Sequence, residues 1–159
     1  MKFKRQYLLN GGLLLLIAML WNIIFYAKLP EVFLIENFTK NIPRIILTFE
    51  SIFRYITFTF TFFIVIELKT RLQKAGLLIF IIGIIIYFSS WSIQMFAHES
   101  MFATSFIGFC APAYTAIIWL LGIGLLSANK YKRMIFIPVS LIFIMLHTVH
   151  IIIVYKQYF

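Results

Sequence analysis

Five long apolar runs are the feature that most constrains what this chain can fold into. A helix needs about 20 mostly apolar residues to cross the hydrocarbon core of a bilayer. The runs that reach this length are approximately Leu8–Ala27, Arg44–Ile66, Ala75–Phe96, Phe102–Leu126 and Met134–Tyr155. The connections between them are short and leave no room for a separate soluble domain. We therefore predict an all-α integral membrane protein in which residues 1–159 form a single transmembrane domain, a bundle of five helices.

The composition agrees with lipid as the main solvent of the protein surface. Hydrophobic residues make up 63% of the chain and charged residues 12%, whereas soluble domains are about half apolar and about a quarter charged. Cys110 is the one cysteine of the sequence, so an intrachain disulfide is excluded and the redox compartment is left open.

The basic residues predict the orientation of the bundle. Fourteen Lys and Arg against five Glu and no Asp give a net charge of +9, but these residues lie in short clusters between the apolar runs. Such clusters are typical of topology signals and do not indicate nucleic-acid binding. One side of the predicted bundle collects nine of the fourteen, namely Lys2, Lys4, Arg5, Lys69, Arg71, Lys74, Lys130, Lys132 and Arg133. We therefore expect a cytoplasmic N-terminus and an outer C-terminus in a multi-pass protein of the cell (plasma) membrane.

Two segments have alternative interpretations. Residues 1–27 have the basic start and apolar stretch of a signal peptide. However, Trp21–Tyr26 continues the apolar run without a small-residue cleavage site, so we expect a retained span. In the first outer loop, Val32–Ile35 is apolar but too short to span. We expect it to lie as a turn on the outer membrane surface.

The second predicted span carries a charged pair. Glu50 and Arg54 are four residues apart, hence on one helical face and able to pair. An ionisable side chain inside a span is costly unless it is paired or faces a cavity, which makes both residues functional candidates. A structural ion pair between helices is the alternative interpretation.

The fourth predicted span contains a helix breaker and two close-packing glycines. Pro112 lacks an N–H, so we expect it to free the carbonyl of Gly108 and to bend the helix. Further along, Gly122 and Gly124 indicate close helix packing.

Polar residues from all five predicted spans fall between the midplane and the outer surface, whereas the inner halves are almost purely apolar. Structural polar residues would have no reason to segregate by depth, so we predict one outward-facing polar pocket closed below by an apolar plug. Its expected members are Asn22, Glu50, Arg54, Ser90, Trp91, Gln94, His98, Tyr114, Thr115, His147 and His150.

Two classes of function fit such a pocket. We favour binding of a small polar or amphipathic ligand, or a lipid, from the outer side, as in a receptor, sensor or carrier. The alternative is a membrane-embedded enzyme, metalloprotein or haem protein that uses the same histidine, glutamate and tyrosine residues. No motif in the sequence identifies a cofactor or a catalytic residue. The bilayer is the expected partner, nucleic acid is not, and a homo-oligomer stays open.

A metal site is the sharpest form of the alternative. His147 and His150 are three residues apart on one helix, and His98, Glu99 or Glu50 could complete a metal-binding shell. We expect no metal site, because the last span offers two donors and the other candidates lie in a loop or are already paired. The histidines are expected to line the ligand pocket instead.

Overall fold

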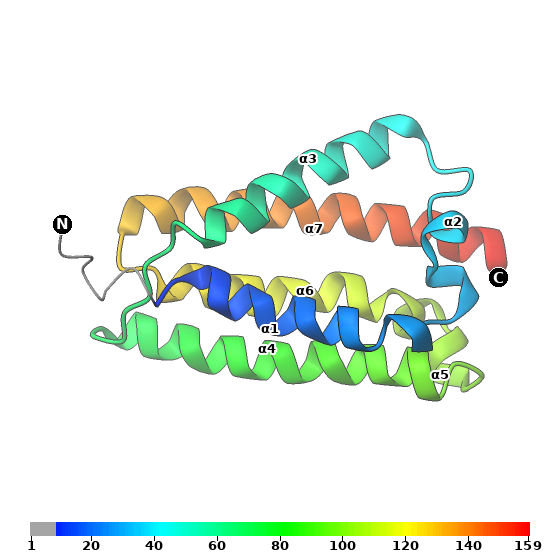
Figure 1. The fold of residues 1–159 in the computed structure, drawn as a ribbon, viewed down its shortest axis with the longest axis horizontal. Coiled ribbons are helices and arrows are strands. Elements are labelled where there is room, and N and C mark those ends of the chain that lie inside the picture. The colour runs from blue at the N-terminus through cyan, green and yellow to red at the C-terminus, as the bar shows by residue number, and fades with distance from the viewer. Residues whose placement is uncertain (1–8) are drawn as a thin grey trace.

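The computed structural model describes residues 9–159 and is all-helical in that range, without a β-strand (Figure 1). Two features of the sequence lie outside the described residues: Leu8, where the first predicted span begins, and the basic cluster Lys2, Lys4 and Arg5. The elements are α1 (Gly11–Ile24), η2 (Tyr26–Lys28), η3 (Glu31–Phe33), α2 (Ile35–Phe38), α3 (Arg44–Thr61), α4 (Arg71–Phe96), α5 (Met101–Thr104), α6 (Phe106–Leu126) and α7 (Lys130–Tyr158).

The long helices α1, α4, α6 and α7 run roughly along one common axis, and α3 is inclined to them (Figure 1). The start of α1 and the α3–α4 and α6–α7 connections lie at one end of the bundle. The α1–α3 and α4–α6 connections and the end of α7 lie at the other end. The most extensive packing is between α4 and α6, followed by α6 with α7 and α3 with α7. Helix α6 is therefore the central element.

Three of these helices, α4, α6 and α7, are long and apolar enough to cross a membrane. Helix α1 is apolar but has 14 residues, which corresponds to about 21 Å. Helix α3 has 18 residues and carries the charged pair Glu50 and Arg54. The predicted helical fold is thus confirmed, and three apolar helices fit a membrane protein. The count of five spans and the orientation stay predictions.

Capping side chains set where several helices begin. Thr70 and Gln73 form a capping box at the start of α4, in which the Gln73 backbone N–H donates to Thr70 Oγ1 over 3.2 Å. Ser105 caps α6 and Asn129 caps α7 in the same manner. As a result α4 and α7 begin four residues earlier than predicted, and the predicted fourth span is divided at Ser105 into α5 and α6.

The predicted span Arg44–Ile66 is too long at its C-terminal end, because α3 ends at Thr61. The apolar residues that follow pair their backbone with two other segments instead of continuing the helix. Ile64 accepts a hydrogen bond from the Gly11 N–H over 2.8 Å, and the carbonyl of Val65 accepts one from Ala128 over 2.9 Å. Ile64 is fully buried, so this segment closes one end of the bundle.

The glycines of α6 pack closely against neighbouring helices, and the carbonyl that its proline leaves free has a side-chain partner. A Cβ added at Gly122 would lie 2.5 Å from the backbone nitrogen of Phe80, and one at Gly124 would lie 2.7 Å from the Ile137 side chain. The expectation of close packing is confirmed. The Gly108 carbonyl, freed by Pro112, accepts a hydrogen bond from Gln94 Nε2 over 2.9 Å.

The segment between α1 and α3 forms short helical turns, and one of its apolar side chains packs into the interior instead of facing outward. Phe33 is 7% exposed. Its ring lies 5.3 Å from that of Trp91 and 5.0 Å from that of Phe109, between centroids. Ile35 remains exposed. The apolar character of Val32–Ile35 does not reveal which side chain packs inward. Through Phe33 the segment covers one end of the interior.

Candidate functional site

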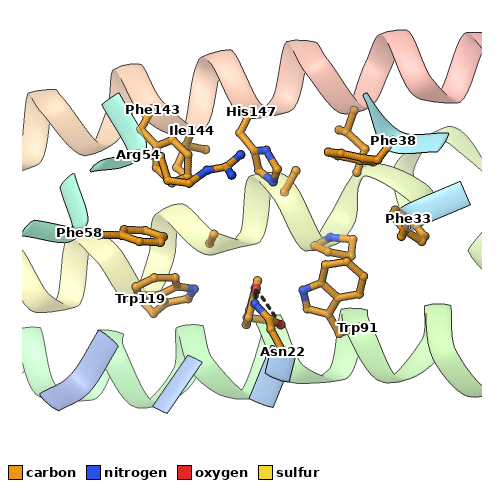
Figure 2. A pocket seen from close by; sticks show the side chains of 15 residues that line it. Asn22, Phe33, Phe38, Arg54, Phe58, Trp91, Trp119, Phe143, Ile144 and His147 are labelled. Atoms are coloured by element: carbon orange, nitrogen blue, oxygen red, sulfur yellow. Dashed lines mark hydrogen bonds between the residues drawn. The ribbon is translucent and has the colours of Figure 1, made fainter. Parts of the chain in front are cut away.

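A cavity of about 280 Å³ lies inside the bundle, between α1, α3, α4, α6 and α7 (Figure 2). It sits nearer the end that carries the α1–α3 connection, because Phe33 and Phe38 of that connection form part of its wall. The lining residues are Asn22, Phe33, Phe38, Arg54, Phe58, Tyr87, Trp91, Pro112, Ala113, Ala116, Trp119, Phe143, Ile144, His147 and Ile151. Four of the predicted pocket residues, namely Asn22, Arg54, Trp91 and His147, are therefore brought together.

Arg54 is the charged side chain that reaches this cavity. Its Nη2 pairs with Glu50 Oε1, one helical turn away on α3, which confirms the expected ion pair. The Glu50 side chain is 1% exposed and that of Arg54 is 39% exposed. A guanidinium has five N–H donors in a fixed fork, so the contact with Glu50 leaves most of the Arg54 donors available to other partners, and Arg54 lines the cavity.

Glu50 also contacts both histidines of α7. His147 Nδ1 lies 3.0 Å from Glu50 Oε1, and His150 Nδ1 lies 2.5 Å from Glu50 Oε2. The Nε2 atom of His150 lies 2.8 Å from the backbone carbonyl oxygen of Phe38. Glu50 and His150 do not line the cavity themselves. Glu50 contacts Arg54 and His147, which do line it, and so orients their side chains.

Two tryptophans supply further donors to the cavity. The indole Nε1 atoms of Trp91 and Trp119 are buried and form no hydrogen bond with the residues that the structure describes. Figure 2 shows the two indole nitrogens on the sides of their rings that face the middle of the cavity. Between them, Asn22 Nδ2 donates to the Tyr87 hydroxyl over 2.9 Å. Trp91 also interacts with that hydroxyl, so Trp119 is the clearer case of a donor that lacks a partner.

A second hollow of about 180 Å³ adjoins the cavity along α1. It shares Asn22, Phe58, Tyr87 and Trp119 with the main cavity, and its remaining wall is apolar, made of Leu15, Ala18, Met19 and Ile23. The two hollows thus lie on either side of four shared residues, with Arg54 in the wall of the main cavity and an apolar wall beside α1 in the second hollow.

Several predicted pocket residues satisfy backbone groups instead of facing the main cavity. The hydroxyls of Ser90, Tyr114 and Thr115 donate to the carbonyls of Tyr87, Ile107 and Ala111, respectively. Gln94 donates to the carbonyls of Ala103 and Gly108. His98 has a side chain that is 58% exposed and lies 4.0 Å from Glu99 at the end of the bundle. The hydroxyl and amide groups of these residues thus have a structural role, because they form hydrogen bonds with backbone carbonyls.

The wall of the cavity contains residues that the sequence analysis did not select. They include Tyr87, Trp119, Phe58 and Phe143 on the long helices and Phe38 in the connection between α1 and α3. One available signal was Trp119, because a buried indole N–H usually finds a hydrogen-bond partner. The Tyr87 hydroxyl carries the same signal. The phenylalanines carry none and were identified by the packing of the helices.

Comparison with known proteins adds no assignment to this picture. No protein-family model matches the chain, and no curated protein sequence or solved structure is similar to it. The function must therefore be inferred from the geometry of the cavity and its surroundings.

Proposed function

We propose that this chain is a five-span plasma-membrane protein that binds a small amphipathic ligand with an acidic head group, taken up from the outer side of the membrane. The ligand head would lie beside Arg54, and its apolar tail would follow the hollow along α1. This is a receptor-, sensor- or carrier-like role, in which the fold supplies a binding site within the membrane.

The observation that carries the proposal is a convergence of hydrogen-bond donors in an otherwise aromatic and aliphatic wall. Arg54 directs a partly exposed guanidinium at the cavity, and Trp119 supplies an N–H without a partner. Buried donors need acceptors, and an ionised carboxylate or a fully ionised phosphate presents only acceptors. Charge-assisted hydrogen bonds from a guanidinium to such a group are about twice as strong as neutral ones.

Glu50 does not block this role. Its two carboxylate oxygens have three partners, Arg54, His147 and His150. An acidic ligand that takes over some of the Arg54 donors therefore leaves Glu50 with hydrogen-bond partners on α7. The ligand exchanges one charge-assisted contact for another, and no isolated buried charge results.

The positions of the basic connections support five spans and a cytoplasmic N-terminus. The described basic residues of the predicted inner side, Lys69, Arg71, Lys74, Lys130, Lys132 and Arg133, belong to the α3–α4 and α6–α7 connections or the adjoining helix starts. These connections lie at the same end of the bundle (Figure 1). Short inner loops rich in Lys and Arg are typical of the cytoplasmic face.

Cysteine labelling tests this topology. In a Cys110→Ala background, a membrane-impermeant maleimide added to intact cells should label cysteines placed at Lys40, Glu99 and Tyr158. It should not label cysteines placed at Lys69 or Tyr131 until the cells are opened. All five side chains are exposed in the structure. The reverse pattern would contradict an outward-facing site.

Fluorescence quenching tests ligand binding directly. All three tryptophans of the chain, Trp21, Trp91 and Trp119, belong to the cavity or its surroundings, so a brominated chain in the hollow should quench their emission. We expect 9,10-dibromostearate to quench purified protein saturably. Arg54→Gln should weaken binding about tenfold or more, because a charge-assisted hydrogen bond contributes roughly 1.5–3 kcal/mol.

Matched controls distinguish ligand binding in the cavity from binding to the detergent-covered surface. The methyl ester of the same brominated acid lacks the charge and should bind weakly to the wild type and to Arg54→Gln alike. Arg44→Gln, a change of the same type at the exposed start of α3, should leave the affinity for the acid unchanged. Equal quenching by acid and ester, without saturation, would refute the proposed head-group site.

A further inference from the structure

Three metal-ligating side chains converge beside the cavity, and the ligand-binding proposal does not require that arrangement. Glu50 comes from α3, and His147 and His150 come from successive turns of α7. One donor atom from each of these three side chains lies within 4.8 Å of the other two. Glu50 and His150 are almost fully buried, whereas His147 is partly exposed and lines the cavity.

The hydrogen bonds of His150 identify which of its nitrogens is available as a ligand. A backbone carbonyl can only accept, so the contact with Phe38 O over 2.8 Å requires a hydrogen on His150 Nε2. A neutral imidazole has one N–H, and Nδ1 then carries a lone pair. That lone pair faces a carboxylate oxygen of Glu50 at 2.5 Å. In the neutral form of His150, two acceptors therefore face each other. A proton on Nδ1, which makes the ring a donor to Glu50, or a metal ion removes this conflict.

A proton or a metal ion can fill that position, and the surroundings favour the metal. A metal-bound histidine usually donates its second ring N–H to a carbonyl or carboxylate, which orients the ring. Phe38 O supplies this contact to His150. In addition, a second imidazole nitrogen, His147 Nδ1, lies 3.0 Å from the other carboxylate oxygen of Glu50. The carboxylate therefore lies between two imidazole nitrogens, and one donor atom from each of the three side chains is within 4.8 Å of the other two.

We propose that Glu50, His147 and His150 bind one divalent transition-metal ion. Two imidazoles and a carboxylate match the ligand preferences of Zn²⁺, with metal–ligand distances of about 2.0–2.2 Å. Ligands of a tetrahedral ion with those bond lengths lie about 3.4 Å apart. The donor atoms of the cluster lie within 4.8 Å of one another, so shifts of up to about 1.4 Å bring all three to one ion. The His147 side of the site faces the cavity and leaves a position for water or another ligand.

This site also removes the reason for expecting no metal. The sequence offered two donors on the last span and placed Glu50 in a pair with Arg54. In the structure Glu50 does pair with Arg54, but the same carboxylate lies between the two histidines. The Arg54 side chain is 39% exposed and can turn toward the cavity when a metal ion takes its place beside Glu50.

Metal loading of the purified full-length protein tests the proposal. Chelator-treated protein should take up close to one Zn²⁺ per chain, measured by elemental analysis after desalting. Its Tm should rise by about 5 °C at a zinc concentration a hundredfold above Kd, because the ion binds the folded state. Glu50→Gln and His150→Ala should lose the tightly held ion, whereas His98→Ala, outside the cluster, should keep it.

Arg54→Gln gives a readout that does not depend on whether the ligand variants fold. Removing a positive charge next to the ion should tighten zinc binding by at least about threefold, while the same variant weakens binding of the brominated acid. Opposite effects on the two ligands support the metal site and keep it distinct from the head-group site. Failure of the wild type to retain zinc, or zinc binding that persists in Glu50→Gln, would overturn the proposal.

Discussion

Replacing Glu50 with alanine is expected to lower the free energy of unfolding of the metal-free protein by about 3 kcal/mol. The change leaves Arg54 without its partner next to an apolar interior, and His147 and His150 lose their common acceptor. Removing one member of a buried ion pair typically costs about 3–5 kcal/mol, and the partial exposure of Arg54 places this case at the lower limit. Unfolding of purified protein in mixed micelles of increasing SDS content measures the effect.

A double-mutant cycle shows whether the charges are coupled. The loss in Glu50→Ala/Arg54→Ala should fall short of the sum of the two single losses by at least about 1 kcal/mol, because the double variant contains no unpaired charge. Glu67→Ala is the matched control. Glu67 pairs with Lys69 over 2.9 Å at the exposed end of the bundle, and its loss should cost less than about 1 kcal/mol. Additive losses at Glu50 and Arg54 would mean that the pair is not coupled.

A methyl group at Gly83 is the second change with a large expected effect. A Cβ there would lie 2.5 Å from the backbone nitrogen of Trp119 and 2.9 Å from the carbonyl carbon of Ile118. A helix backbone cannot move aside in the way a side chain can, so α4 and α6 must separate. We expect Gly83→Ala to cost about 2 kcal/mol, within the range of overpacked cores, despite the better helix propensity of alanine.

The same substitution on α1 provides the comparison for Gly83. A Cβ at Gly12 would meet the ring of Phe62 at 2.4 Å, but Phe62 is 51% exposed and its ring can rotate away. Gly12→Ala should therefore be close to neutral in the same SDS unfolding experiment. Equal costs at the two glycines would contradict the close α4–α6 contact on which the position of Trp119 depends.

The sequence predicted those features of the fold that follow from local physics. The apolar runs predicted the helices, the spacing of Glu50 and Arg54 predicted their pairing, and Gly122 predicted close packing. Each of these depends on helical periodicity or on the size of one residue. The helix ends were less predictable, because the end of α3 is set by backbone pairing of Ile64 and Val65 with distant segments.

The candidate site was predictable only in part, because a polar residue on a helix does not reveal its partner. Asn22, Arg54 and His147 line the cavity, but Gln94 and Thr115 bond to backbone carbonyls close by. The sequence pattern cannot distinguish these outcomes, since both satisfy a polar group inside a span. Glu50 between His147 and His150 required the packing of α3 on α7, which brings residues 97 and 100 positions apart into contact.

Crystals of the protein grown with 9,10-dibromostearate give the most direct test of the proposed amphipathic site. Anomalous scattering locates the bromine atoms without reference to any assumed pose. Binding as proposed places the bromine signal in the hollow lined by Leu15, Met19 and Trp119, with the carboxylate density beside Arg54. Bromine signal confined to the outer, lipid-facing surfaces of α4 and α7, with none in the hollow, would contradict the account.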